Sequence, residues 1–563
     1  MKNIQPHWAL TFLALTISLL SCQDDFLNTK VDTLRTQEMI NSSYYNFFNF
    51  AATPYTFLYS DFNSITSSGA ITDEAEPTSA SVSSKEFTEG RWNAFNNPDD
   101  KYATYYNAIR SANYFLEIAD NYRAILGKNR DTVSTDGIKS YNEDLDNALW
   151  FRAEAHISRA YYYFELLKRY GGVPLVTKTL TVSENANIAR SSYDEIVKFI
   201  IDEIDNNLGQ LQTNWKTSSF KNYDGRFSKG SAMALKSRVL LYAASPLHNS
   251  IGDVNYDQKW MDAALAALDV INYKQYSLDV TNYANYFLLN NTLTSTETIL
   301  CVRNWESNYL ERANYPIATP GGNSGVCPTQ NLVSDFEIKD KTIAVDPKNP
   351  YKNRDPRLAI FVVTQGSTWN SRVIDNSAGG VDDMANSNTT KTGYYLKKLM
   401  NDKLDLIKNQ GVVHNWVIFR YAEILLNYAE ALNEVFGPDN DSGLGLTPRQ
   451  ALNMVRSRVG VAMPNVTTTD KALFRSAVKH ERRIELAFEG HRYWDLLRWK
   501  DAEMILNQPI QGVSISKNTD GTFSFQVRNV GTRTFDASKM YYYPISQSEI
   551  NKSKGVLLQN PNW

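Results

Sequence analysis

The 563-residue sequence contains only three cysteines and six histidines, and the histidines are scattered. It lacks the motifs HExxH, GxSxG, GxxxxGK[ST] and GxGxxG, which mark zinc proteases, serine hydrolases and nucleotide-binding proteins. The formal net charge is only -3. No long basic run is present, which argues against nucleic acid as the main partner. These absences leave little support for a metalloenzyme, a nucleotide-dependent enzyme or a nucleic-acid-binding protein.

The N-terminal segment has the pattern of an export signal. Lys2 precedes an apolar run from Trp8 to Leu20, which is shorter than the about 20 residues of a spanning helix but suits a signal-peptide core. The run leads into Leu-Leu-Ser-Cys, which resembles a bacterial lipobox ending at Cys22. We therefore expect residues 1–21 to be a lipoprotein signal peptide and Cys22 to carry lipid, such as palmitate. Ordinary secretion with cleavage nearby is the alternative.

Two cysteines remain, Cys301 and Cys327. An exported protein can form disulfides, so these two residues could pair, but two free buried thiols are an equal alternative. Neither cysteine has a neighbour at metal-ligand spacing. We expect no bound metal and no cofactor.

Helical periodicity recurs along most of the chain, with apolar residues in alternating steps of three and four. The ends are marked by Ser191 or Ser192 as an N-cap, and by Gly171-Gly172 and Gly437-Pro438 as stops. We expect eight helices, with apolar faces over residues 102–119, 149–167, 193–208, 232–242, 261–271, 417–435, 451–459 and 473–488. The pattern predicts a mainly α fold, a tetratricopeptide-like solenoid of helical hairpins over about 102–272 and 416–500.

Two stretches without helical periodicity, about 60–100 and 275–415, are rich in Asn, Ser, Thr, Gly, Pro and aromatic residues. Strand-like runs occur within the second stretch, at 296–303, 359–364 and 393–398. Long irregular segments commonly carry binding surface, so we expect the ligand-binding portion here.

The segment HERRIELAFEGHRYWDLLRWK, residues 480–500, concentrates charge. In a catalytic interpretation Glu481 and Glu485 would work with His480 or His491 as acid and base. The adjacent arginines would instead hold the carboxylates ionised in salt bridges, while apolar neighbours bury the same helix. We therefore interpret the segment as a packed helical hairpin with an ion-pair network.

Two further polar motifs have a structural and a functional interpretation. Asp355-Pro356-Arg357 is conspicuous, and we interpret it as a capped turn that starts a strand. Asp382-Asp383 lies in a Gly/Asn-rich loop and could bind a cation, although a solvated loop is the favoured interpretation.

Aromatic residues in the irregular stretches are the best candidates for ligand binding. A flat ring in a polar loop can pack on the C–H face of a sugar, while nearby amides and charges bind its hydroxyls. For each ring a core position is the competing interpretation. The candidates are Trp92, Asn304, Trp305, Tyr309, Tyr315 and Trp369, with Arg303 and Asn323 as further polar neighbours.

Nine segments, in order, resemble the SusD/RagB family of outer-membrane lipoproteins. They include SCQDDFL, FRAEAHISRAYYYFELLKRYGGVPLV, YKNRDPRL and IFRYAEILLNYAEALNE, and QNPNW closes the chain. Their positions are 21–27, 91–117, 151–176, 227–244, 328–337, 351–358, 418–434, 480–500 and 541–550.

The resemblance implies a single domain over 22–563, with about four tetratricopeptide-like helix pairs that support an irregular binding face. It implies a non-catalytic protein on the exterior of the outer membrane, which captures oligosaccharides and passes them to a TonB-dependent SusC-like transporter. Family resemblance places Trp92, and the stretch of Trp305 and Tyr309, in binding regions. A peptide-binding, RagB-like member is the alternative, and a surface glycosidase is a third class.

Overall fold

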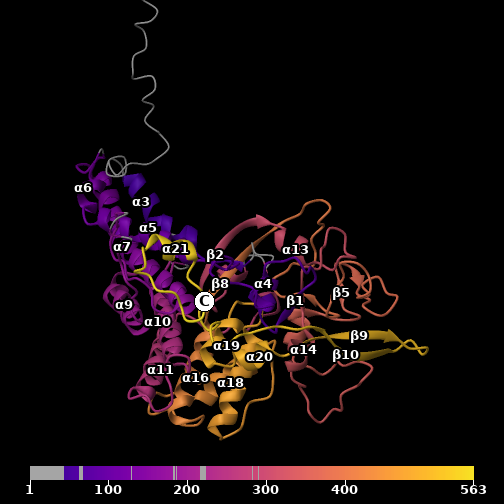
Figure 1. Cartoon of the computed structure of the whole chain (residues 1–563). Coiled ribbons are helices and arrows are strands. Elements are labelled where there is room, and N and C mark those ends of the chain that lie inside the picture. Colours follow the sequence, from indigo (N-terminus) through magenta and orange to yellow (C-terminus); the bar gives the residue numbers. More distant parts are fainter. Residues whose placement is uncertain are drawn as a thin grey trace, which may run out of the picture. The chain divides into compact units, whose positions relative to one another are not determined.

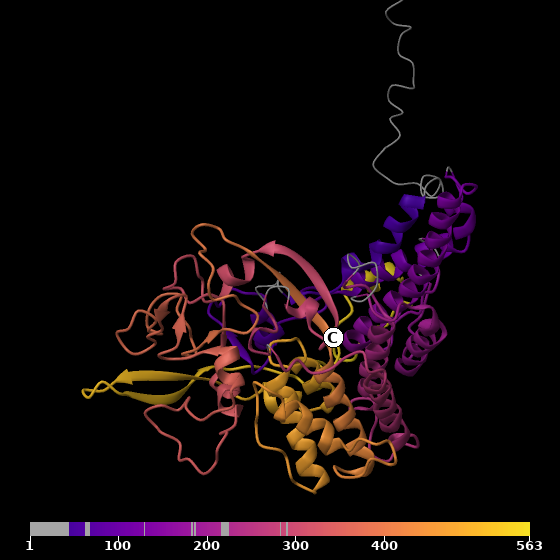
Figure 2. The ribbon, with the colours of Figure 1, turned by 180° about the vertical axis from the view of Figure 1, so that it is seen from behind.

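The computed structural model describes residues 44–61, 68–128, 130–181, 184, 187–215, 224–281, 283–288 and 291–563 (Figures 1 and 2). The predicted signal peptide and Cys22 lie outside the described residues. The chain divides into a smaller unit, Met1–Phe50 with Ile118–Ala148, and a larger unit, Ala51–Glu117 with Leu149–Trp563. The extent of a single domain over 22–563 stays a prediction.

The described chain is mainly helical, which confirms the predicted fold class. In the larger unit, α10 packs on α9 and α11, α11 on α16, and α16 on α17 and α18. This succession of neighbouring helices is the tetratricopeptide-like arrangement expected from the periodicity. The long helices are α5 (Tyr102–Ala119), α7 (Thr135–Tyr170), α9 (Tyr193–Asn207), α10 (Lys229–Ala244), α11 (Tyr256–Asn272), α16 (Tyr421–Phe436), α17 (Pro448–Ser457), α18 (Lys471–Glu485) and α19 (Arg492–Trp499).

Local signals fix several helix ends. Ser192 and Glu195 form a reciprocal capping box at the start of α9, and Thr447 and Gln450 form another at α17. Gly171 follows α7 with φ +71°, a conformation that glycine adopts without steric cost.

Two helix predictions need correction. α7 begins at Thr135, well before the predicted Leu149, because its first half is polar and shows little apolar periodicity. Val417 lies in a strand, and helix α16 begins only at Tyr421. Seven consecutive buried residues precede that helix, and such a run does not distinguish a buried strand from a buried helix.

Shorter helical elements connect the long ones and fill the irregular stretches. They are α3 (Tyr44–Ala52), η2 (Thr53–Phe57), η4 (Ser68–Ile71), α4 (Ser84–Thr88), α6 (Tyr122–Leu126), η5 (Leu208–Gln210), η7 (Tyr283–Asn285), α12 (Asn291–Thr294), α13 (Tyr309–Asn314), α14 (Gln330–Asp335), α15 (Arg357–Phe361), α20 (Ala502–Leu506) and α21 (Gln547–Lys552).

All strands of the described chain form two-stranded antiparallel sheets. The hairpin of β9 and β10 extends away from the helices in Figure 1 and was not predicted. The run at 296–303 overlaps β2 from Thr298 onward, and 393–398 contains β7. The run at 359–364 is helical up to Phe361, and only Val362–Val363 forms a strand. The pairs are β1 (Ala75–Pro77) with β3 (Val326–Pro328), β2 (Thr298–Ser307) with β8 (Val412–Arg420), β4 (Val362–Val363) with β7 (Tyr395–Leu396), β5 (Thr368–Trp369) with β6 (Arg372–Val373), and β9 (Ile510–Lys517) with β10 (Phe523–Gly531).

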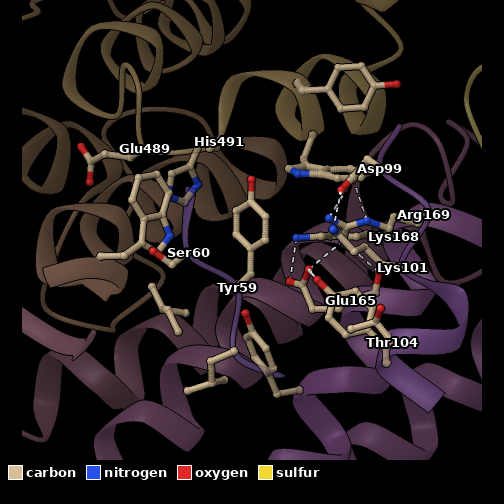
Figure 3. Close-up of a pocket in the computed structure, with 18 of the residues that line it drawn as sticks. Tyr59, Ser60, Asp99, Lys101, Thr104, Glu165, Lys168, Arg169, Glu489 and His491 are labelled. Atoms are coloured by element: carbon tan, nitrogen blue, oxygen red, sulfur yellow. Dashed lines mark hydrogen bonds and ion pairs between the residues drawn. The ribbon is translucent and has the colours of Figure 1, made fainter. Parts of the chain in front are cut away.

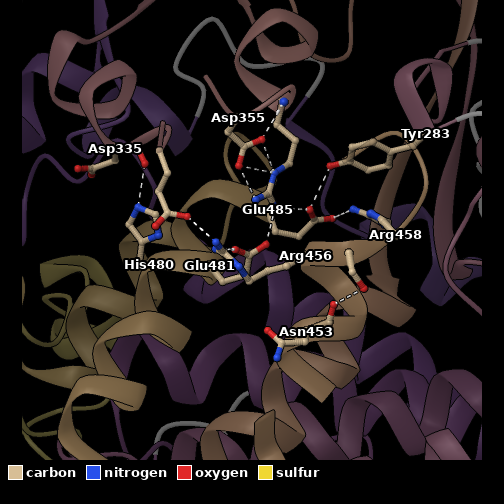
Figure 4. A network of polar contacts seen from close by, with 12 residues as sticks. Tyr283, Asp335, Asp355, Asn453, Arg456, Arg458, His480, Glu481 and Glu485 are labelled. Carbon is tan, nitrogen blue, oxygen red and sulfur yellow. Dashed lines mark hydrogen bonds and ion pairs between the residues drawn. The ribbon is translucent and has the colours of Figure 1, made fainter. Parts of the chain in front are cut away.

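The charged segment 480–500 forms part of a buried ion-pair network (Figure 4). Glu481 binds Arg456 at 2.8 Å, and Glu485 binds Arg357 at 2.9 Å and Arg420 at 2.7 Å. Burial opposes ionisation of Glu485, but the surrounding arginines outweigh it and hold its pKa far below the usual range. The carboxylates are thus committed to arginines, as the scaffold interpretation predicts.

Arg357 belongs to this network and corrects the interpretation of its motif. The motif starts helix α15 and no strand. The Arg357 guanidinium is fully buried and bridges Asp355, at 2.7 Å, to Glu481 and Glu485 of α18. The motif therefore anchors the irregular stretch to the helical scaffold.

Candidate functional site

A cavity of about 490 Å³ lies within the larger unit (Figure 3). Helix α7 supplies Tyr161, Glu165 and Lys168, whose spacing of four and three residues places them on one helix face. The turn before α19 contributes His491, and β8 contributes Trp416. Many aromatic rings contribute to the lining: Phe57, Tyr59, Phe87, Tyr105, Tyr161, Tyr242, Trp416, Tyr493, Trp494 and Tyr543.

Charged side chains form a row along one wall. Arg169 donates from Nε to Asp99 Oδ2 at 3.0 Å and from Nη1 to Glu165 Oε2 at 2.7 Å, and Lys168 Nζ donates to Glu165 Oε1 at 2.7 Å. Burial opposes ionisation of Glu165, but Lys168 and Arg169 outweigh it and lower its pKa to about 2. Burial lowers the pKa of Lys168 to about 8, against the opposing influence of Glu165.

His491 is a neutral lining group. Burial, together with Arg238 and Arg482 nearby, lowers its pKa well below the ordinary value. Neither ring nitrogen has a hydrogen-bond partner among the described residues, and the same holds for the hydroxyls of Tyr161 and Tyr242, which also line the cavity. The cavity therefore presents hydrogen-bonding groups that no described protein group uses.

Trp305 lies on β2, outside the cavity lining, and is 93 % exposed. The strand pairing steps from Arg303 opposite Asn415 to Glu306 opposite Val413, so β2 carries one extra residue here. Such a bulge redirects side chains. Asn304 lies in the bulge, and its Nδ2 is 3.5 Å from Oγ of Ser60, which lines the cavity. Tyr309, at the start of α13, is 42 % exposed.

Three predicted ligand residues prove to be core side chains. Trp92 is 1 % exposed and packs on Phe87 and Trp563, each with ring centroids 4.6 Å away. Tyr315 and Trp369 are fully buried and meet edge to face at 5.0 Å. The prediction of these three rings as ligand contacts is wrong for this structure, because their faces are covered by protein.

Phe95 is a candidate that the sequence analysis missed. It is 84 % exposed, at the tip of a tight turn in which the backbones of Asn93 and Asn96 exchange hydrogen bonds of 3.0 and 3.1 Å. The Asn93 side chain also accepts from the Phe95 N–H at 2.9 Å. Asparagine favours turns, so the asparagines on either side of Phe95 are a local sequence signal that predicts this turn.

The remaining candidates have structural roles. Cys301 and Cys327 are both buried, and no disulfide joins them. Asp382 is fully buried and bound by both terminal nitrogens of Arg372 at 2.7 Å. Among the described residues, no group of three or more His, Cys, Asp or Glu side chains is arranged to hold a metal ion. No helix in the same residues has the length and apolar character needed to cross a membrane.

Comparisons with known proteins match nearly the whole chain. The family described as "SusD family" matches residues 296–563, and the one described as "Starch-binding associating with outer membrane" matches residues 23–241. A relative, SusD-like protein P38 of Formosa agariphila, is 28 % identical over 65 % of this chain and 69 % of that protein.

Solved structures have the same fold. A SusD-like protein from Bacteroides fragilis superposes with a TM-score of 0.76 at 27 % identity, over 94 % of this chain and 99 % of its own. A second protein of that organism, described as a SusD-like carbohydrate binding protein, gives a TM-score of 0.73 at 25 % identity, over 91 % of this chain and 99 % of its own. The two family matches, the relative and these structures agree, and the chain belongs to the SusD family.

Proposed function

We propose that this protein captures oligosaccharides at the outer surface of the outer membrane and passes them unchanged to a TonB-dependent SusC-like transporter. In this proposal, lipid on Cys22 anchors the chain. The observation that carries it is Trp305, an indole with 93 % of its surface exposed on a bulged strand that touches the cavity wall. Large aromatic side chains so fully exposed commonly mark interaction sites.

The chemistry of the site suits a sugar. Pyranose rings offer apolar C–H faces, which pack on indole and phenol rings, and hydroxyls, which need hydrogen-bond partners. Trp305 supplies a free ring face, while the cavity supplies aromatic walls and the uncommitted polar groups of His491, Tyr161 and Tyr242. Its volume of about 490 Å³ falls within the range usual for small-molecule sites.

The carboxylates that line the cavity favour a binding role over catalysis. A glycosidase needs one carboxyl group that is protonated near neutral pH beside a second carboxylate. Glu165 is instead kept ionised by two cations, and Glu489 is bound by Lys398 and Arg420, each at 2.7 Å. Both carboxylates are thus occupied by cations of the protein itself.

The family supports the same proposal. One matched family is described as starch-binding and associated with the outer membrane, and a structural relative is described as carbohydrate binding. A peptide ligand is the alternative, as in RagB-like members, and it would rely on backbone contacts more than on an exposed indole.

The proposal is tested by screening the protein against a glycan array and a peptide library. We expect saturable binding of at least one glycan class, weakened in Trp305→Ala. Tyr45→Ala is the matched control, because Tyr45 is also exposed, at 67 %, but lies in the smaller unit. Binding of peptides alone, or glycan binding that is equally strong in Trp305→Ala, would exclude the proposed site.

A further inference from the structure

The cavity lining has one more cation than it has anions to neutralise it. Arg238 also lines the cavity, but Glu423 binds it at 2.6 Å, and Glu489 is neutralised by two cations outside the lining. The row that remains is Lys101, Asp99, Arg169, Glu165 and Lys168. Three of these five side chains are cationic and two are anionic.

Lys168 stands at one end of this row, and its ammonium group can donate more hydrogen bonds than it makes. An ammonium group carries three donors. Among the described residues, Glu165 is the one hydrogen-bond acceptor of Lys168. Its Nζ otherwise lies 4.7 Å from the ring centroid of Trp494 and 5.7 Å from that of Phe164, and its side chain is only 11 % exposed.

A buried ammonium with so little compensation is costly, because burial removes its hydration. The arrangement becomes favourable when an anion enters the cavity and accepts from the remaining protons. Charge-assisted hydrogen bonds of this kind are stronger than neutral ones.

The rest of the lining restricts the kind of molecule to which this anionic group can belong. The rings of Tyr59, Trp416 and Trp494 offer flat apolar walls, and neutral His491 can bind hydroxyls as donor or acceptor. An inorganic anion would make no use of these ring faces or of the hydroxyl-binding capacity of His491, whereas a sugar with a charged substituent uses both.

We propose that the cavity accepts an acidic sugar residue, one bearing a carboxylate or a sulfate group, with Lys168 as its counter-ion. This inference rests on the proposed function and names the ligand class: acidic rather than neutral oligosaccharides. Uronic acids and sulfated sugars share the required chemistry.

Binding of such a ligand is coupled to protonation. The pKa of Lys168 is about 8, set by burial, with Glu165 raising it and Arg169 and Arg238 lowering it; His491, also in the lining, is neutral. A bound anion raises this pKa, so complex formation takes up a proton when the pH is near 8. As the pH rises further, the protonated fraction falls and affinity for the acid falls with it, by up to about tenfold per pH unit.

The test is calorimetric titration of the full-length protein with three tetrasaccharide probes: galacturonate tetramer, a sulfated galactose tetramer and neutral galactose tetramer. We expect at least one acidic probe to bind at least about tenfold more tightly than the neutral one. We also expect its binding enthalpy near pH 8 to change with the ionisation enthalpy of the buffer, as proton uptake requires.

Lys168→Met tests the counter-ion directly. We expect this variant to bind the acidic and neutral probes about equally, whereas Lys178→Met keeps the preference. Lys178 is the matched control because it is 65 % exposed and pairs only with Glu184 among the described residues. If Lys168→Met does not fold, buffer-dependent proton uptake by the unmodified protein decides the matter.

The outcomes separate this inference from the proposed function. Equal or weaker binding of both acidic probes, absence of proton uptake, or a preference that survives in Lys168→Met would each overturn the inference. If the neutral probe still binds in any of these cases, and Trp305→Ala abolishes that binding, the proposed function remains intact. A response to acidic peptides but to none of the three sugars would overturn both.

Discussion

Replacing Trp305 with alanine should weaken glycan binding while leaving the fold intact. The side chain is 93 % exposed, so its removal should change the free energy of unfolding by no more than about 0.5 kcal/mol. A sugar ring over one indole face covers roughly 100 Å², worth about 2.5 kcal/mol at about 25 cal/mol per Å². The cost of ordering the ligand reduces this gain, so we expect a loss of roughly 1–2 kcal/mol, or about 5- to 30-fold in affinity.

The assay is isothermal titration of a glycan identified on the array, paired with thermal melting. Trp92→Ala provides the contrast, because Trp92 is 1 % exposed and packed among aromatic rings. Its removal should cost about 3–5 kcal/mol of stability and leave affinity unchanged well below the melting temperature. The reasoning is refuted if Trp305→Ala binds like the unmodified protein, or if Trp92→Ala weakens binding without lowering the melting temperature.

Three further predictions concern stability and anchoring. Arg357→Ala should destabilise the protein by about 3–5 kcal/mol in chemical denaturation, because Asp355, Glu481 and Glu485 would each lose a buried cation; a midpoint like that of the unmodified protein would contradict this. Burial raises the pKa of Glu74 to about 7, so its folded form binds a proton more readily than its unfolded form, and stability is lost as pH rises from about 4.5 through 7. The free energy of unfolding of Glu74→Gln should therefore exceed that of the unmodified protein by on the order of 2 kcal/mol at pH 8, and the two values should be nearly equal at pH 5. An equal difference at both pH values would exclude this titration. Cys22→Ser should prevent incorporation of labelled palmitate and release the protein from the membrane fraction, and retention with label would show that lipid is attached elsewhere.

Local sequence signals predicted the parts of the fold that are decided within a few residues. Helix α5 runs over Tyr102–Ala119, where the apolar spacing placed it, and Ser192 caps α9 as expected. The first half of α7 escaped notice because residues such as Asp144 and Asn147 give it no continuous apolar face. β9 and β10 were not predicted, although Phe523, Phe525 and Val527 of β10 alternate with polar residues, which is the pattern expected of a strand.

The site was only partly predictable for a different reason. Trp305 and Trp92 look alike in sequence, as tryptophans in polar, irregular stretches. Trp92 is buried because Phe87, Tyr543 and Trp563 converge on it, two of them from the far end of the chain. The cavity likewise combines residues from Thr56 to Tyr543, a convergence that no local pattern encodes. One local signal was available: Glu165, Lys168 and Arg169 interrupt an otherwise aromatic and aliphatic face of α7, and buried charge of this kind points to a special site.

The central claim is that a rigid helical scaffold presents a ring-lined site that binds carbohydrate without altering it. The most direct measurement is titration of the full-length protein, in detergent, with oligosaccharides chosen from the glycan array, followed by chromatography of the recovered ligand. The account predicts saturable binding that depends on Trp305 and a ligand recovered at its original length. Shortened products, or binding of peptides with no oligosaccharide bound at any concentration tested, would contradict it.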